Sequence, residues 1–237
     1  MYSIQMGQSE LFEEIAPDGN LPGTDTAPGE CLAGLYELSS NAYHAALYAI
    51  MSERPIRREI SRFTEKVLKA GQSGAGCNTE EARIAADKAA TDRGDPDVLT
   101  ILKAAGQVQH EIHRLTGLLR FSREENGAYV ARCSPDFRVL PALADHFTLR
   151  FGETPWAIID EKRKLCLCRL EKGPARLIPW EENPANAPDD ESWEDLWRLY
   201  FRSINNEARA NPRLQRQLMP ERYRKYLPEL EQGTGSL

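Results

Sequence analysis

The chain has 237 residues, of which 41% are hydrophobic and 28% are charged, and its formal net charge is −6. This length suffices for one large domain or two small ones, and 31 Gly and Pro residues, a share near the average, exclude collagen-like and low-complexity proteins. The longest uninterrupted apolar run, Ala45–Met51, has seven residues against the roughly twenty that a membrane helix needs, so no membrane span is predicted.

The start of the chain and its cysteine content indicate the compartment. Residues 1–5 have neither the basic nor the apolar region of a secretion signal. Five cysteines are an odd and small number, which argues against a disulfide framework and favours a reducing environment. We therefore expect a cytoplasmic protein.

The first part of the chain is predicted to be helical after a lead-in. Residues 8–30 are polar and rich in Gly and Pro, so residues 1–30 are expected to form a flexible lead-in, either a loop or a mobile arm. Three helices follow: one marked by Leu32, Leu35 and Leu38, one capped by Ser39 or Ser40, and one with Pro55 in its first turn. A Gly/Ser loop at 71–76 leads to an Ala-rich charged stretch, either a helix with little core of its own or a flexible segment. Residues 31–94 thus form a helical N-terminal subdomain.

The strongest helical pattern runs from Asp97 to Thr116. Asp95 fits the N-cap and Pro96 the first helical position. Apolar residues then recur with the helical period, namely Val98, Ile101, Leu102, Ala105, Val108, Ile112 and Leu115. At about 100° per residue, His110 lies nearly opposite this stripe and His113 on its flank.

The period then changes from helical to extended. Segments 118–121 and 128–132 flank Asn126-Gly127, the dipeptide most typical of a tight hairpin. A helix is expected over 139–151, followed by three strands over 156–160, 165–170 and 175–179.

The last part of the chain is predicted to return to helices. After an acidic linker, one helix carries Trp193, Leu196, Trp197, Tyr200, Phe201 and Ile204, and an Arg-rich helical pair surrounds Pro212 and Pro220. The predicted fold class is α+β, a helical N-terminal part followed by a small, mostly antiparallel sheet flanked by helices. Residues 95–230 form its core domain and 231–237 a tail.

Charge is segregated along the chain. Seven acidic residues and no Lys or Arg lie between Glu181 and Asp195, whereas eight Lys and Arg stand against two Glu between Arg198 and Lys225. A chain that contacts phosphate locally and repels it elsewhere shows this pattern. An Arg-rich helix that pairs with the acidic linker shows it as well, and both interpretations stay open.

The sequence contains no recognisable catalytic constellation. It lacks a nucleophile elbow, a phosphate loop and a dinucleotide fingerprint. Cys166 and Cys168 share one face of a strand, but their spacing is not that of structural zinc sites and favours small core residues. An acidic cluster with a divalent metal is conceivable at Asp136, His146, Asp160 and Glu161, although the spacing does not demand it. No cofactor and no metal is predicted.

Three groups of motifs together resemble one bacterial family. They are His113–Phe121; Val139–Pro141 with His146–Phe147, Arg150–Phe151 and Pro155–Trp156; and Asn211–Arg216 with Met219–Pro220, Arg222–Tyr223 and Lys225–Tyr226. The chain is similar, over roughly residues 8–230, to the family described as probable DNA metabolism protein. The family has no assigned reaction.

The resemblance implies a context in DNA metabolism. Its members are typically encoded beside a radical SAM protein of DNA modification or repair, and are often fused to a uracil-DNA glycosylase-superfamily domain. This chain departs from the family pattern at Thr116, Arg138, Leu218 and Arg224, where the family usually has Lys, Asn, His and Trp. The departures at Thr116 and Leu218 argue against catalysis by the family's Lys and His at these two positions.

We expect an accessory protein in DNA repair or modification that binds DNA weakly and in a salt-dependent manner. The partner would be a radical SAM protein, with a uracil-DNA glycosylase-superfamily protein as another. Expected nucleic-acid-binding residues are His113, Arg114, Arg120, Arg213, Gln215, Arg216, Arg222, Tyr223 and Lys225. Two alternatives are an enzyme that acts on a nucleic-acid base or backbone through His113 and Asp136 or Glu111, and a protein-interaction module without DNA contact.

Overall fold

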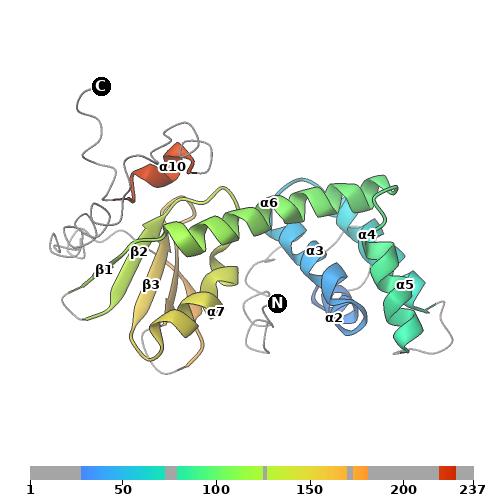
Figure 1. Ribbon diagram of the computed structural model, residues 1–237, viewed down its shortest axis with the longest axis horizontal. Coiled ribbons are helices and arrows are strands. Elements are labelled where there is room, and N and C mark those ends of the chain that lie inside the picture. The colour runs from blue at the N-terminus through green and yellow to red at the C-terminus, as the bar shows by residue number, and fades with distance from the viewer. Residues whose placement is uncertain (1–27, 73–78, 125–126, 170–172, 181–218, 228–237) are drawn as a thin grey trace, which may run out of the picture. The chain divides into compact units, whose positions relative to one another are not determined.

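The computed structural model describes residues 28–72, 79–124, 127–169, 173–180 and 219–227 (Figure 1). The chain divides into two compact units. The first comprises Met1–His113 with Phe137–Val139, and the second Arg114–Asp136 with Leu140–Leu237.

The first unit is built from helices. They are α2 (Pro28–Leu38), α3 (Ser40–Met51), α4 (Arg57–Gln72), α5 (Glu80–Ala90) and the first part of α6 (Pro96–Leu118). Ser39 caps α3, since its hydroxyl accepts a hydrogen bond from the backbone N–H of Ala42 at 3.0 Å. The Ala-rich stretch forms α5, which begins after its cap Thr79 and buries Ala82, Ala86 and Ala90.

Two helix starts test the cap predictions. Asp95 caps α6 as predicted, because its Oδ1 accepts the N–H groups of Asp97 at 2.8 Å and Val98 at 3.1 Å. The prediction for Pro55 is wrong by two residues, since α4 begins at Arg57. The carbonyl of Ile56 accepts the first helical hydrogen bond, from Ile60 N at 3.0 Å, so Pro55 precedes the cap of α4.

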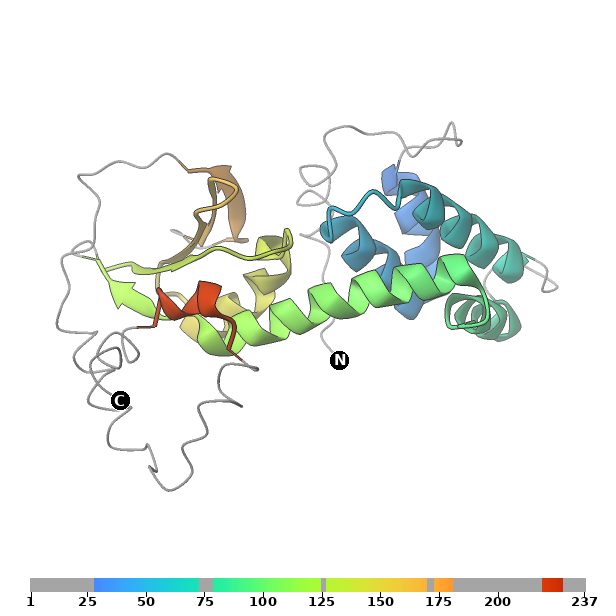
Figure 2. The ribbon, with the colours of Figure 1, turned by 90° about the horizontal axis from the view of Figure 1, so that it is seen from above.

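A five-stranded sheet forms the centre of the second unit. Its strands are β1 (Phe121–Arg123), β2 (Tyr129–Cys133), β3 (Trp156–Asp160), β4 (Leu165–Arg169) and β5 (Arg176–Pro179), in that spatial order. Only β2 and β3 pair in parallel, and the helix α7 (Leu140–Phe151) connects them. A short helix, α10 (Glu221–Arg224), lies beside the sheet (Figures 1 and 2). The α+β class is confirmed.

The first strand starts later than predicted. Segment 118–121 was expected to be extended, but α6 continues through Leu118 and β1 begins at Phe121. Leu119 N still donates to Leu115 O at 3.1 Å, and both leucines are buried one helical turn apart. Burial of this pair extends the helix into residues whose alternation resembles a strand.

The two faces of the sheet differ in what packs against them. On one face, α7 packs on β3 and β4, and Phe147 of α7 lies 6.1 Å from Trp156 between ring centroids. The other face holds a small cluster of Ala157, Ile159, Cys166 and Cys168, against which Val130 and Trp180 pack. None of the described helices combines the length and apolar character that crossing a membrane requires.

Candidate functional site

The parallel pairing of β2 and β3 brings the carboxyl ends of two strands together, with Cys133 opposite Asp160. Asp160 is 1% exposed, and its carboxylate accepts the N–H groups of Lys162 at 3.0 Å and Arg163 at 3.1 Å. The Arg163 guanidinium donates to the same carboxylate at 3.1 Å and to the carbonyl of Asp136 at 2.8 Å. A buried ion pair therefore fastens the turn after β3 to the loop after β2.

The C-terminal segment 219–227 docks on these two loops. Glu161 Oε2 accepts hydrogen bonds from the Tyr226 hydroxyl at 2.6 Å and from Lys225 Nζ at 3.0 Å. Arg222 forms an ion pair with Asp136 at 2.7 Å. The two loop carboxylates are thus the counter-charges of Arg222 and Lys225.

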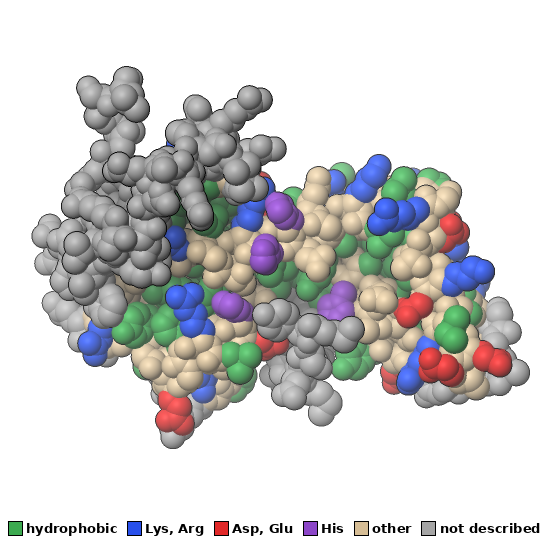
Figure 3. All heavy atoms as spheres, viewed as in Figure 1, with side chains coloured by type: hydrophobic (Ala, Val, Ile, Leu, Met, Phe, Trp, Pro, Cys, Tyr) green, Lys and Arg blue, Asp and Glu red, His purple; other side chains and the backbone are tan. Residues whose placement is uncertain are grey.

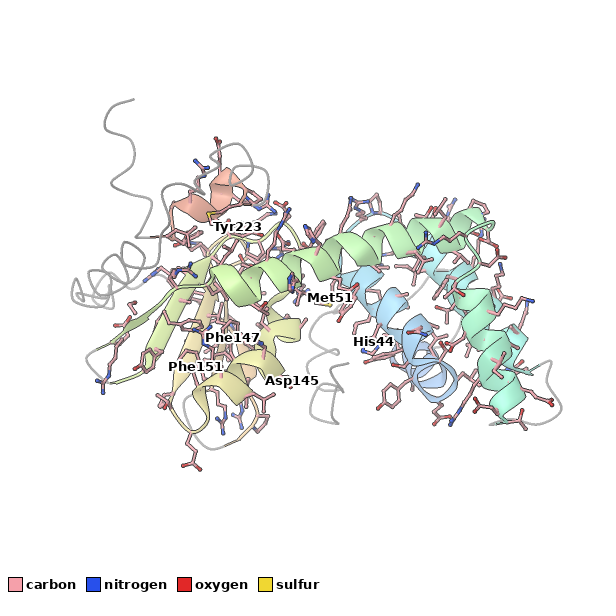
Figure 4. The ribbon with its side chains drawn as sticks, viewed as in Figure 1. His44, Met51, Asp145, Phe147, Phe151 and Tyr223 are labelled. Atoms are coloured by element: carbon pink, nitrogen blue, oxygen red, sulfur yellow. The ribbon has the colours of Figure 1, made fainter. Side chains whose placement is uncertain are left out.

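Two buried side chains anchor the same segment. Tyr223 is 2% exposed and Leu227 is fully buried, and Figure 4 shows Tyr223 at α10. The Arg222 guanidinium lies 4.7 Å from the centroid of the Tyr223 ring. Because its ring is enclosed, Tyr223 acts as a packing anchor of the segment.

The docked segment shifts the titration of two groups. Burial raises the pKa of Glu161, but the hydrogen bonds from Tyr226 and Lys225 and the charges of Lys225 and Arg132 outweigh burial, so the net pKa is lowered. Burial raises the pKa of Tyr226, and its hydrogen bond to Glu161 raises it further.

Acid is expected to weaken the docking of this segment. Since the pKa of Glu161 is lowered by folding, its contribution is complete above the ordinary glutamate pKa of about 4.3 and is lost as the pH falls through the lower folded value. Urea unfolding at several pH values should show Glu161→Gln about 1 kcal/mol less stable than the wild type at pH 7, with a difference that shrinks as the pH falls below the ordinary glutamate pKa of about 4.3. A difference that is constant with pH would contradict this assignment.

The sequence-predicted binding residues fall into different surroundings. Arg222 and Lys225 pair with carboxylates, and Tyr223 is buried. His113 is exposed and Arg114 is half-buried, whereas Arg120 donates to the carbonyl of Gly117 at 2.9 Å and so caps the end of α6. Outside the described residues lie Arg213, Gln215 and Arg216, together with the acidic linker and the helix expected around Trp193.

The acid and base candidates are distributed over the two units. Glu111 is 2% exposed and accepts the N–H of Phe137 at 2.8 Å, while His113, two positions further along α6, is exposed. These two side chains therefore lie on different sides of one helix. On α7, burial and the charge of Arg150 lower the pKa of His146, and burial raises the pKa of Asp145, which Figure 4 labels on this helix.

The paired thiols on β4 form an electrostatic couple. The hydrogen bond between the two thiols raises the pKa of Cys166 and lowers the pKa of Cys168. The positive charge of Arg176, which lies opposite Cys168 on β5, lowers the pKa of Cys168 further. Both side chains are 7% exposed and belong to the apolar cluster. Within the parts of the chain that the structure describes, no group of three or more His, Cys, Asp or Glu residues is arranged to hold a metal ion.

Positive charge is concentrated in the second unit. Its described residues include 13 Lys and Arg against 7 Asp and Glu, an excess of six, whereas those of the first unit include 11 against 12. Figure 3 shows basic side chains beside hydrophobic ones on the viewed side of the sheet-containing unit. The sequence did not indicate that Asp136 and Glu161 neutralise part of this charge, although Glu161 directly follows a predicted strand and Asp136 lies four residues after another.

Comparison with known protein families assigns most of the chain to a family. A family model described as a domain of unknown function, DUF4130, matches residues 80–229. Neither a curated protein nor a solved structure matches the chain significantly. The matched region contains α5, the whole of α6, the described sheet, α7 and α10. Because the model spans more than half of the 237 residues, this chain belongs to the DUF4130 family.

Proposed function

We propose that this protein is an accessory protein of DNA repair or modification, which contacts DNA weakly through its second unit. The observation that carries the proposal is the excess of six positive charges in the described part of that unit, within a chain of net charge −6. Proteins bind DNA non-specifically by neutralising phosphates with Lys and Arg, and a local excess serves this even in an acidic chain.

Three arginines are suited to phosphate contact. Arg123 and Arg150 are exposed and Arg114 is half-buried, so part of each residue is accessible to solvent. Arg222 and Lys225 are engaged by Asp136 and Glu161, which reduces their attraction for phosphate. We therefore expect the first three arginines to contribute more to DNA affinity than these two C-terminal residues.

The resemblance of the motifs to the family of probable DNA metabolism proteins supports the same role and names a partner. Under this proposal the protein acts beside a radical SAM protein that modifies or repairs DNA, with a uracil-DNA glycosylase-superfamily protein as another partner. The docked segment 219–227 would serve as a structural support of the unit.

The test compares two triple variants that lose equal charge. Fluorescence anisotropy with single- and double-stranded DNA at two salt concentrations should show binding that weakens with salt. Arg114→Gln/Arg123→Gln/Arg150→Gln should lower affinity at low salt about tenfold or more and reduce the log–log salt slope by about 2 to 3. The matched control is Arg57→Gln/Arg58→Gln/Arg83→Gln, which removes three exposed arginines from the first unit.

Two outcomes would contradict the proposal. One is affinity that does not change with salt, and the other is an equal loss of affinity in both triple variants. Circular dichroism and the melting temperature must show that both variants are folded, so that a loss of affinity reports on contact.

A second candidate is a protein-interaction module without DNA contact. The pairs Arg222–Asp136 and Lys225–Glu161 favour it, because basic residues of the C-terminal motif have intramolecular partners. This candidate requires that no oligonucleotide binds at low salt, and the radical SAM protein then becomes the first bait for an interaction assay.

A further inference from the structure

Four side chains form a row across one face of the sheet. Arg123 of β1 pairs with Tyr129 of β2, Tyr129 with Trp156 of β3, and Trp156 with Arg169 of β4. Residues paired in adjacent strands project from the same face, so the row reads basic, aromatic, aromatic, basic. Each member comes from a different strand.

The end of α7 adds two side chains to this row. The ring of Phe151 is stacked on Tyr129, with centroids 5.2 Å apart and an interplanar angle of 29°, and it meets Phe121 edge-on at 4.7 Å. Figure 4 shows Phe147 and Phe151 between α7 and the sheet. The Arg150 guanidinium lies 5.9 Å from the Phe151 centroid.

The side chains of the row and of α7 fall into a buried inner layer and a partly exposed outer layer. Trp156 and Phe147 are completely buried and form the inner layer. Above them Phe121, Tyr129 and Phe151 are half-buried, and the guanidinium groups of Arg123 and Arg150 are exposed at their edge. We call Phe121, Arg123, Tyr129, Arg150 and Phe151 the aromatic platform.

The platform is fixed before any ligand arrives. Tyr129 and Phe151 hold each other in a stacked orientation, and Tyr129 N donates to Pro155 O at 2.9 Å. Arg169 donates to the carbonyls of Gly152 and Gly173, at 2.7 Å for the latter, and so fastens the turn that follows Phe151. Rigid aromatic side chains lose little conformational entropy on binding.

We propose that the aromatic platform binds an unpaired base of single-stranded DNA, with Arg123 and Arg150 contacting the flanking phosphates. Sequence-tolerant single-strand binding combines positive side chains along the backbone with aromatic rings on which bases stack. The platform has both parts within one patch, and its two exposed cations match a polyanion rather than an apolar peptide. This inference rests on the proposed function, since it specifies which form of DNA the second unit prefers.

The experiment separates base stacking from phosphate contact. Anisotropy is measured at low salt with a labelled 12-residue oligothymidylate and with an abasic oligonucleotide of the same length. Tyr129→Leu should weaken binding of oligothymidylate about tenfold, in line with the loss of one stacked base, and leave binding of the abasic strand unchanged. The matched control is Tyr36→Leu, which removes a 54% exposed tyrosine from the first unit.

A second variant keeps the test decisive if Tyr129→Leu folds poorly. In Tyr129→Trp the new indole should lose fluorescence when oligothymidylate binds, beyond any change of the four native tryptophans in the wild type, and should not respond to the abasic strand.

The outcomes distinguish the two proposals. Salt-sensitive binding that is equal for both oligonucleotides and unaffected by Tyr129→Leu would overturn the platform and leave the proposed function standing. Absence of binding to every oligonucleotide at low salt would overturn both. Tighter binding of oligothymidylate than of the abasic strand, lost in Tyr129→Leu but not in Tyr36→Leu, supports the platform.

Discussion

Replacing Asp160 with alanine is expected to lower the free energy of unfolding by about 3 kcal/mol. The carboxylate is 1% exposed and accepts two backbone N–H groups and the Arg163 guanidinium. Alanine would leave these donors unsatisfied and would leave the Arg163 side chain, itself only 12% exposed, without its counter-charge. A buried charge that has lost its partner accounts for most of the expected cost.

Urea denaturation followed by tryptophan fluorescence measures this effect, since Trp156 lies at the other end of the same strand. Asp160→Asn should lower the free energy of unfolding less than Asp160→Ala does, because the amide oxygen can still accept hydrogen bonds from the backbone N–H groups of the turn. Glu153→Ala, at an exposed position, serves as the control and should change stability by less than 0.5 kcal/mol. Equal stability of Asp160→Ala and the wild type would show that the ion pair does not hold the turn.

The second large effect is expected from Tyr223→Ala, which should cost about 3 kcal/mol of stability. The ring is 2% exposed and, with the fully buried Leu227, fixes segment 219–227 on the second unit. Removing the ring leaves a cavity, and the remaining ion pairs of Arg222 and Lys225 are too exposed to compensate. The segment is expected to detach locally before the unit unfolds.

Hydrogen exchange across the segment distinguishes local detachment from global unfolding. Protection should fall in residues 219–227 of Tyr223→Ala and persist in β3. Tyr223→Phe keeps the ring and should stay within about 1 kcal/mol of the wild type, because the loss of one hydroxyl is small. If instead Tyr223→Ala keeps full stability and loses only DNA binding, the ring is a nucleic-acid contact, as the sequence suggested.

Local sequence signals predicted most of the second unit's elements. The antiparallel pairing of β1 with β2, the helix after Val139 and the strand from Trp156 to Asp160 all occur where short-range patterns predicted them, while Asn126 itself lies outside the described residues. Helix α6 also begins at its predicted cap. These features depend on turn chemistry, capping and periodicity, which are encoded within about ten residues.

The pairing of strands that are far apart in the sequence could not be predicted from such local signals. No local pattern states that β2 pairs in parallel with β3, and this pairing decides that Asp136 and Glu161 lie side by side with the C-terminal segment. The basic residues of that segment looked free because their counter-charges are about 60 to 90 positions away in the chain. The same long-range register creates the row from Arg123 to Arg169.

The parallel pair also has a consequence for the order in which the sheet assembles. Antiparallel partners such as Asp160 and Leu165, or Arg123 and Tyr129, are five or six residues apart, whereas Tyr129 and Trp156 are 27 apart. Closing the longer loop costs more chain entropy before the strand contacts can form, so the β1–β2 hairpin and the three-stranded β3–β4–β5 meander are expected to form early and to pair with each other late. The rate of folding should therefore depend on α7, which connects the hairpin to the meander, more than on any of the hairpin turns.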